Sequence, residues 1–312
     1  MGDKSATGLA DACSAGPGAE PPDPHAAAEP GAAARGPSLS PSRAGDFLTC
    51  PLLYRYRVID RLPEPPSPAA VRGTLVHSVL ERLFDAAAAD RTPDAARALV
   101  EPEWSRLQEA EPDLGDLFDD DAQRAAWLDE VMGMLDRYFT LEDPRRIEPA
   151  HRELCVEAEL ASGLRLRGYI DRLDIAPGGQ MRIVDYKTGG APPEEFEQRA
   201  LFQMRFYALT LWRAQGQVPK LLQLMYLGNG EIVRYEPDEA DLLATERKIE
   251  ALWLAIERAT LNRDWRPRPG RICDWCAHQA ICPAFGGTPP PVPDAPVRPE
   301  DVPEPRDGAS PV

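Results

Sequence analysis

Two aspartates and a lysine are the residues of this sequence whose types and spacing most readily suggest chemistry. Asp185 and Lys187 lie in the stretch RIVDYKTGG (182–190), among apolar residues and a tyrosine, and Asp171 lies upstream of both. The lysine is unusual, because only four of the 35 basic residues in this chain are lysine. On an extended strand, an acid and a lysine two positions apart point to the same face and could act together there.

A predicted β-hairpin sets the two aspartates opposite each other. Residues 165–175 and 181–187 read as strands, and the APGGQ segment between them reads as a turn. Symmetric pairing about that turn places Asp171 opposite Asp185, with Cβ atoms about 5 Å apart, and Lys187 on the same face. Two carboxylates so close repel unless one is protonated or a cation lies between them. The hairpin therefore predicts a site for a hard divalent cation.

The simpler alternative is that these charges are structural. Asp171 could pair with Arg172 or Arg167, and Lys187 could extend into solvent from the end of its strand. A register shifted by one residue would also put the aspartates on opposite faces of the sheet. Glu157, on the preceding strand, is a weak further candidate for the site.

Predicted helices supply a third ligand and a polar pair. His77 lies on an amphipathic helix, residues 69–88, although a lone helix histidine is more often a core residue. Imidazole with two carboxylates suits Mg²⁺ or Mn²⁺ better than it suits a zinc site built of thiolates. Gln203 and Tyr207 are four residues apart on the helix 194–214 and share a face. They either contact a substrate beside the metal or form an ordinary surface pair.

Four cysteines form a second candidate centre. The segment CDWCAHQAIC contains three of them, and the fourth lies far upstream; they are Cys50, Cys273, Cys276 and Cys282. Cys13 and Cys155 are poorer candidates, and His278 competes as a ligand within the segment itself. Four thiolates, or three with one imidazole, suit tetrahedral Zn²⁺, but structural zinc sites more often have two paired knuckles. The chemistry of the cysteines alone leaves the bound group open.

The elements that must position these residues alternate in type. Amphipathic helices come first, then three strands, a helix, two strands and a long helix at 238–259. Residues 109–121 carry seven acids and no base, which predicts a solvated loop. This order is typical of an α/β domain with a central mixed β-sheet flanked by helices.

Composition divides the chain into three parts. Residues 1–37 are rich in Ala, Gly and Pro, and residues 288–312 are rich in Pro and acids, so both are expected to be disordered tails. Residues 38–287 are expected to form a single folded domain.

The charge and the missing motifs exclude several classes of protein. A net charge of −16 excludes nonspecific coating of nucleic acid by the whole surface. DNA contact would need local patches, for which the candidates are the arginine-rich segments 42–73 and 263–271, the second with Trp265 between its arginines. There is no phosphate-binding loop of a nucleotide-driven motor, no apolar membrane span and no signal peptide. We therefore expect a cytoplasmic protein without a membrane association.

The motifs together resemble a known family. RGTLVHSVLE, GYIDRLD, IVDYKTG and QMRFY are similar to the successive motifs of the RecB-type branch of the PD-(D/E)XK nuclease superfamily. The resemblance implies that His77, Asp171, Asp185 and the backbone carbonyl of Tyr186 bind the metal. It also implies that Lys187 is catalytic, together with the two aspartates, and that Gln203 and Tyr207 form a downstream substrate-binding motif.

The cysteine spacing adds to this resemblance. One cysteine before a nuclease core and three after it resemble AddB-type and CRISPR-adaptation nucleases, in which this pattern holds a 4Fe–4S cluster. Such a cluster would join the N-terminal and C-terminal segments of the domain. The sequence thus predicts a stand-alone, Mg²⁺- or Mn²⁺-dependent DNA exonuclease of DNA repair or recombination, served by a separate helicase. The alternative is a catalytically silent DNA-binding or scaffold subunit held together by an iron–sulfur or zinc site.

Overall fold

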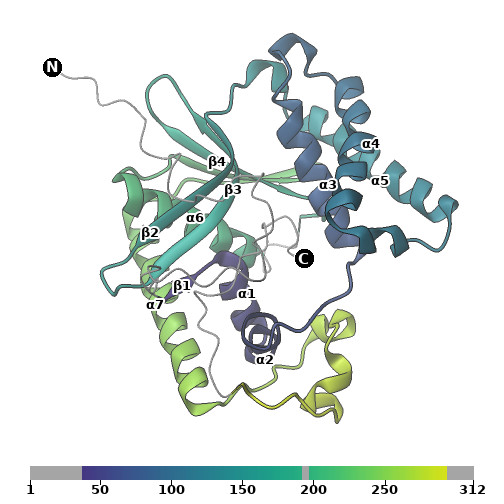
Figure 1. Ribbon diagram of the computed structural model, residues 1–312. Helices are drawn as coiled ribbons and strands as arrows, with labels where there is room; N and C mark the ends of the chain where they lie inside the picture. Colours follow the sequence, from purple (N-terminus) through teal and green to yellow (C-terminus); the bar gives the residue numbers. More distant parts are fainter. Residues whose placement is uncertain (1–36, 192–196, 294–312) are drawn as a thin grey trace, which may run out of the picture.

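A six-stranded mixed β-sheet forms the centre of the molecule (Figure 1). The computed structural model describes residues 37–191 and 197–293. The strands are β1 (Ser38–Leu39), β2 (His151–Glu159), β3 (Arg165–Ile175), β4 (Met181–Lys187), β5 (Leu221–Tyr226) and β6 (Glu231–Tyr235). Their order is β1-β3-β4-β5-β6, with β2 also paired to β3. The pairs β1–β3 and β4–β5 are parallel and the other pairs are antiparallel, so the predicted mixed sheet is confirmed.

Helices cover both faces of this sheet. They are α1 (Pro41–Thr49), α2 (Pro51–Tyr54), α3 (Pro68–Leu83), α4 (Pro93–Ala110), α5 (Asp121–Leu141), α6 (Glu197–Gln215) and α7 (Glu239–Asn262). Helix α6 packs on β2, β3, β4 and β5, and α7 and α1 pack on α6. Helices α3, α4 and α5 form a separate group on the right of Figure 1. The side chains that cap these helices are of the types that favour a helix start; they are Ser40, Ser67, Thr92, Asp120 and Asp238.

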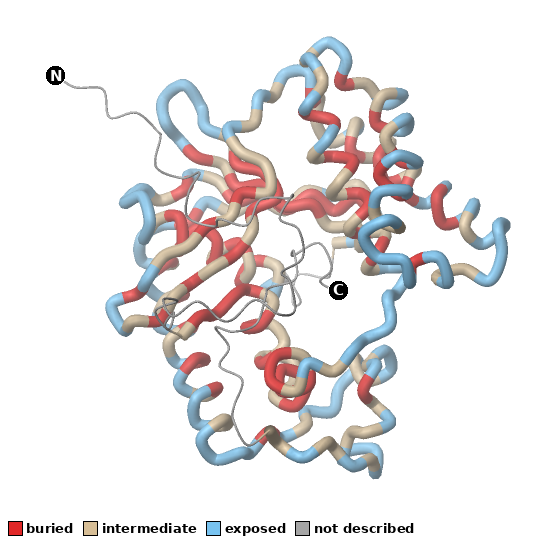
Figure 2. Tube along the Cα trace, in the orientation of Figure 1, coloured by how far each residue is buried: buried red, intermediate tan, exposed pale blue. Residues whose placement is uncertain are grey.

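Strand β4 contributes to two hydrophobic cores, because successive side chains of a strand point to opposite faces. Ile183 belongs to the core that includes α6 and α7. Val184 and Tyr186 belong to the core formed with α3, α4 and α5. The buried residues accordingly follow the sheet through the middle of Figure 2. Asp185 therefore shares the face of Ile183, toward α6, and the Tyr186 ring lies on the opposite face.

One edge of β3 pairs with β2, and its other edge pairs with two different strands. Arg165 and Leu166, at the start of β3, pair with β1. The other end, from Arg172 to Ile175, pairs with β4. Asp171 thus lies where the pairing with β4 has just ended, in the stretch between the two partners.

The predicted order of elements is confirmed, with two omissions and several shifted boundaries; the helix expected at 69–88, for example, ends at Leu83. The sequence did not indicate β1 or α4, and β2 begins at His151, three residues before the expected strand. The acidic stretch 109–121 is not wholly a loop, because α4 ends within it and Pro112–Asp116 forms a 3₁₀ turn. Most of each predicted tail, 1–37 and 288–312, lies outside the described residues. Among the described helices, none combines the length and apolar character needed to cross a membrane.

Candidate metal-dependent active site

The predicted hairpin has the register that the turn indicated. Leu173 pairs with Ile183, and Ile175 pairs with Met181. The paired residues end at Arg172 and Val184, one position before the two aspartates. Beyond that point, the backbone N–H of Tyr186 donates instead to the Asp171 carboxylate, Oδ2, at 2.7 Å. The strands therefore begin to separate where the two carboxylates lie.

His77 reaches this separation from α3. Its Nε2 lies 2.8 Å from the carbonyl oxygen of Tyr186, and its Nδ1 lies 3.5 Å from Asp171 Oδ2. The structure thus brings together three of the predicted ligand groups, namely the imidazole, the Asp171 carboxylate and the Tyr186 carbonyl. All are oxygen or imidazole donors, the types that Mg²⁺ and Mn²⁺ accept.

Lys187 lies at the start of a line of polar contacts toward α6. Its Nζ is 2.9 Å from Asp185 Oδ2 and donates to Gln203 Oε1 at 2.8 Å. The amide nitrogen of Gln203 donates in turn to the Tyr207 hydroxyl at 3.0 Å. Tyr207 is almost fully buried, so this line of contacts leads into the core.

Burial makes the Asp171 carboxylate costly to ionise. Burial of Asp171 raises its pKa to about 6; the charge of His77 opposes this rise, and the neighbouring Asp185 adds to it. Asp185 Oδ2 is also buried, and it lies 2.9 Å from the Lys187 ammonium. Two neighbouring buried acids, beside an imidazole and a backbone carbonyl, fit a site for a divalent cation.

Glu153 joins the site, although the sequence did not single it out. One ligand atom each from His77, Glu153 and Asp171 lie within 4.8 Å of one another. In the register of β2 and β3, Arg152 pairs with Arg172 and Leu154 pairs with Ile170, so Glu153 lies across from Asp171. Glu153 itself has a left-handed backbone, with φ of 45°. Such a conformation is uncommon for a residue with a side chain and is found at functional sites.

The signal that could have indicated Glu153 was the turn between β2 and β3. Extending the antiparallel register backward from that turn reaches Glu153 opposite Asp171, but the expected strand began one residue later, at Leu154. Glu157, the weak candidate from the sequence, pairs instead with Arg167 at 3.2 Å. Asp171 does not form the ion pair with Arg167 or Arg172 that the structural alternative required, because Arg172 binds other acids.

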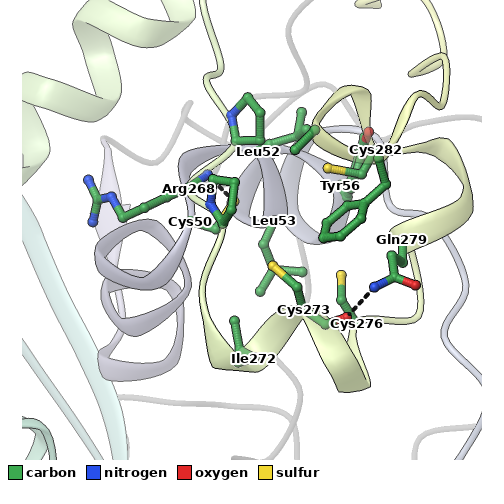
Figure 3. A pocket seen from close by; sticks show the side chains of 14 residues that line it. Cys50, Leu52, Leu53, Tyr56, Arg268, Ile272, Cys273, Cys276, Gln279 and Cys282 are labelled. Atoms are coloured by element: carbon green, nitrogen blue, oxygen red, sulfur yellow. Dashed lines mark hydrogen bonds between the residues drawn. The ribbon is translucent and has the colours of Figure 1, made fainter.

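The four candidate cysteines line one pocket between α2 and the segment after α7 (Figure 3). Two backbone amides already donate to thiols, from Arg268 to Cys50 Sγ at 3.3 Å and from Gly270 to Cys273 Sγ at 3.4 Å. The sulfurs are nevertheless not tightly clustered, since no three of them in the described residues lie within 4.8 Å of one another. The predicted 4Fe–4S staple is therefore not shown, although the two segments it would join do lie side by side.

His278 has a different role from the one considered for it. Its Nε2 lies 2.8 Å from Glu64 Oε1, and its ring packs edge-on against Tyr56 with centroids 5.1 Å apart. Although burial of Glu64 opposes the shift, hydrogen bonds from His278 and Arg57 lower its pKa to about 2. The Tyr56 hydroxyl also donates to the carbonyl of Ile281 at 3.1 Å. These contacts tie the cysteine segment to the first helices.

The structure corrects the predicted DNA patches. Trp265 is buried and stacks on Tyr54 with ring centroids 5.7 Å apart, so it is a core residue. Arg43 and Arg55, in the first arginine-rich segment, are buried as well. The exposed aromatic of the cysteine segment is Trp275, which is 76% accessible. The exposed arginines near it in the sequence are Arg263, Arg266, Arg268 and Arg271.

Known proteins resemble this chain over most of its length. Residues 38–283 match the family model described as the PD-(D/E)XK nuclease superfamily. The Gene 69 protein of Mycobacterium phage D29 is 25% identical over 277 residues, which cover 80% of this chain and 97% of the phage protein. The Gene 69 protein of Mycobacterium phage L5 is 24% identical over 290 residues, with the same two coverages.

A solved structure shares the fold. The crystal structure of a protein from Eubacterium rectale, described provisionally as an exonuclease, superposes with a TM-score of 0.51. The match covers 77% of this chain and 87% of that protein, at 15% sequence identity. At this identity the likeness concerns the fold alone.

Proposed function

Because this chain belongs to the PD-(D/E)XK nuclease superfamily, we propose that it is a Mg²⁺- or Mn²⁺-dependent deoxyribonuclease of the RecB branch. It hydrolyses phosphodiester bonds from DNA ends, as an exonuclease in DNA repair or recombination. The observation that carries the proposal is the line of contacts from Asp185 through Lys187 to Gln203, beside Asp171 and His77. Membership of a superfamily of nucleases supports the same reaction.

The cation would be held by the groups that converge where β3 and β4 separate. The groups in contact there are the Asp171 carboxylate, the His77 imidazole and the Tyr186 carbonyl, with Glu153 close by. We assign the Asp185 carboxylate to the same cation as a proposal, because it is buried on the neighbouring strand. The fit rests on the chemistry of these donors, since two neighbouring buried acids lie beside an imidazole and a backbone carbonyl. When bound, the metal lowers the pKa of a coordinated water and stabilises the negative charge that develops on the phosphate.

Lys187 is the proposed catalytic residue of the chain itself. Contacts with Asp185 and Gln203 fix its ammonium group in one place, and Tyr207 fixes Gln203. From there the ammonium can orient the attacking water and neutralise charge at the reacting phosphate. A compact ammonium suits this task better than the planar fork of arginine, which explains a lysine in an arginine-rich chain.

Replacing Lys187 by alanine tests the assignment. We expect Lys187→Ala to fold and to bind Mn²⁺, but to lose about 10²–10³-fold in kcat on DNA, the usual loss when one stabilising group is removed. Lys220→Ala is a matched control, because Lys220 is exposed and pairs with Glu236 at 2.6 Å on the surface. Wild-type cleavage by Lys187→Ala would overturn the assignment. A wild-type protein that binds DNA without cutting it would favour the silent DNA-binding subunit.

The requirement for an end is tested with linear and circular DNA. End-labelled linear duplex, linear single strands and covalently closed circles are incubated with Mg²⁺ or Mn²⁺, and products are followed with time. The exonuclease proposal expects release of short products from linear molecules only. Digestion of closed circles at a comparable rate would contradict it.

We also propose that Cys50, Cys273, Cys276 and Cys282 hold a 4Fe–4S cluster that staples α2 to the C-terminal segment. All four line one pocket, and backbone amides donate to two of the thiols. A single zinc ion, with Zn–S bonds of about 2.3 Å, would bring its sulfurs to within about 4 Å of one another, whereas no three of these sulfurs lie within 4.8 Å of one another in the described residues. Iron and sulfide analysis with visible absorption, on anaerobically purified protein, decides between the two; stoichiometric zinc without sulfide would refute the cluster.

The partner proposed for this nuclease is a separate helicase, with both acting in the cytoplasm. The support is that the sequence contains no phosphate-binding loop that could drive unwinding. Addition of a helicase and ATP should accelerate digestion of blunt duplex DNA. Full-rate digestion of blunt duplex by the protein alone would argue against this requirement.

A further inference from the structure

Arg172 forms a dense set of buried contacts next to the site, on the face of the sheet toward α3 and α5. Its Nη1 donates to the Tyr186 hydroxyl at 2.6 Å, and both terminal nitrogens bind the carboxylate of Glu142. Its Nε lies 3.2 Å from Asp174 Oδ1. Only 1% of this side chain is exposed, and its guanidinium lies over the Phe84 and Tyr186 rings.

Tyr186 links this arginine to the candidate ligands. Its hydroxyl accepts from Arg172, its backbone N–H donates to Asp171, and its carbonyl lies 2.8 Å from His77. One residue is therefore held at three points, and two of those points are groups of the proposed metal site. A movement of the Tyr186 ring would be passed to its own peptide groups and so to Asp171 and His77.

The contact lies where the hairpin loses its backbone pairing. The last backbone pair of the two strands joins Arg172 to Val184, and Tyr186 is two residues further along β4. The side-chain bond from Arg172 to Tyr186 therefore crosses between the strands diagonally, just past the end of the ladder. It connects β3 to β4 at the level of the carboxylates of Asp171 and Asp185.

We propose that Arg172 and the Tyr186 hydroxyl form a clamp that sets the spacing of β3 and β4 at the metal site. Arg172 is a positioning residue, which acts through Tyr186 on the carbonyl and on the two carboxylates. The inference rests on the proposed function, because it assigns a role in holding the same cation. Groups that orient metal ligands commonly change metal affinity or activity by about 10–100-fold when they are altered.

Tyr186→Phe is the mildest test, because it removes the bonded hydroxyl and keeps the buried ring. We expect its Mn²⁺ dissociation constant, measured by calorimetry on metal-free protein, to rise about tenfold or more. The kcat on DNA should fall in a similar proportion, while KM for DNA stays within twofold. The matched control is Tyr54→Phe, which deletes a buried hydroxyl in the other hydrophobic core, away from Arg172, Glu142 and Tyr186.

Arg172→Lys provides the second arm. Lysine keeps the positive charge, but its single ammonium group cannot bridge Glu142 and Tyr186 as the planar guanidinium of Arg172 does. If both variants act through one contact, the double variant should weaken Mn²⁺ binding by less than the product of the two single effects. Independent effects that multiply fully would contradict a shared clamp.

The outcomes separate this inference from the proposed function. Unchanged Mn²⁺ affinity and kcat in Tyr186→Phe, with or without a lower melting temperature, would overturn the clamp and leave the nuclease assignment standing. Normal Mn²⁺ binding by a wild-type protein that does not cleave DNA would overturn the nuclease assignment. In that case the Mn²⁺ affinity of Tyr186→Phe relative to that of the wild type would still test the clamp. A wild-type protein that binds no Mn²⁺ would overturn both.

Discussion

Asp171 shows how the environment of a single residue prepares a site for a cation. Its carboxylate is buried, accepts a backbone N–H and lies beside a second acid, Asp185. Burial is the main cause of its raised pKa, so the protein without a cation resists the charged form. A bound cation would reverse that preference, because it favours the ionised carboxylate.

Asp171→Asn should therefore stabilise the metal-free protein at alkaline pH. The pKa of Asp171 is raised from 3.8 to about 6, so folding disfavours the ionised form of this carboxyl. Above pH 6 the carboxyl is ionised in the folded protein, and there it destabilises the fold most. The two-unit difference corresponds to about 1–3 kcal/mol, which asparagine would recover at pH 8 but not at pH 4. Urea unfolding at the two pH values measures this.

The comparison of Asp171→Asn with the wild type can also be made in the presence of Mn²⁺. Mn²⁺ should raise the melting temperature of the wild type at pH 8 and have little effect on Asp171→Asn. If Asp171→Asn were the less stable protein at pH 8 without metal, the argument from burial would be wrong.

At this scale the sequence indicated residues whose position follows from local rules. The pair Asp171 and Asp185 followed from a symmetric turn, since register in a short hairpin depends on the turn. Glu153 did not follow, because its left-handed backbone obeys no strand pattern. Trp265 and Trp275 could not be distinguished either, because burial of a tryptophan in a loop depends on distant residues such as Tyr54.

At the scale of elements, the contact between β3 and α6 fixes the side of the candidate site that contains Gln203 and Tyr207. A Cβ atom at Gly168 of β3 would lie 2.6 Å from the Tyr207 ring of α6, which is closer than atoms can approach. The absence of a side chain therefore lets α6 lie close enough for Tyr207 to hold Gln203, and Gln203 to hold Lys187. The glycine belongs to the site although it makes no polar contact with it.

Gly168→Ala should consequently reduce activity as well as stability. Overpacking of this kind costs about 1–3 kcal/mol, and displacement of Tyr207 should lower kcat by loosening Lys187. Gly133→Ala, in α5, is the control: the nearest atom to its Cβ is 3.8 Å away, and alanine should stabilise that helix by up to about 1 kcal/mol. Stopped-flow cleavage and thermal unfolding measure both, and full activity in Gly168→Ala would contradict this coupling.

The sequence predicted elements well where their periodicity was strong. The strands β3 and β4 and the helices α3, α6 and α7 lie close to their expected places. Helix α4 was missed because Pro102 lies inside it, and proline normally ends a helix. Strand β1 has two residues and exists only through its pairing with β3, so no local pattern could have indicated it.

For the whole molecule, the main electrostatic question is how a chain with a net charge of −16 binds DNA. We propose that the exposed arginines of residues 263–271, with the exposed Trp275, form a contact surface for single-stranded DNA. Guanidinium groups contact phosphates and an exposed indole can stack on a base. The rest of the surface would repel DNA and so confine it to this side.

Arg271→Glu should weaken binding of a labelled single strand by about tenfold at low salt. It should also reduce the slope of log affinity against log salt concentration by about 0.7, the value for one phosphate contact on a single strand. Arg146→Glu, the same charge change at an exposed site on another part of the protein, should leave the slope unaltered. Equal effects of the two variants, by fluorescence anisotropy, would show that only net charge matters.

The two hydrophobic cores have a consequence for how the chain folds. The core around α3, α4 and α5 is built mainly from residues 71–139, which are close together in the sequence. The other core joins Leu39 and Tyr54 to Leu166 and Trp265, across most of the described chain. Contacts between distant residues form slowly. We therefore expect the three-helix unit to gain protection from hydrogen exchange first, and the catalytic strands to be completed only when both ends of the domain have come together.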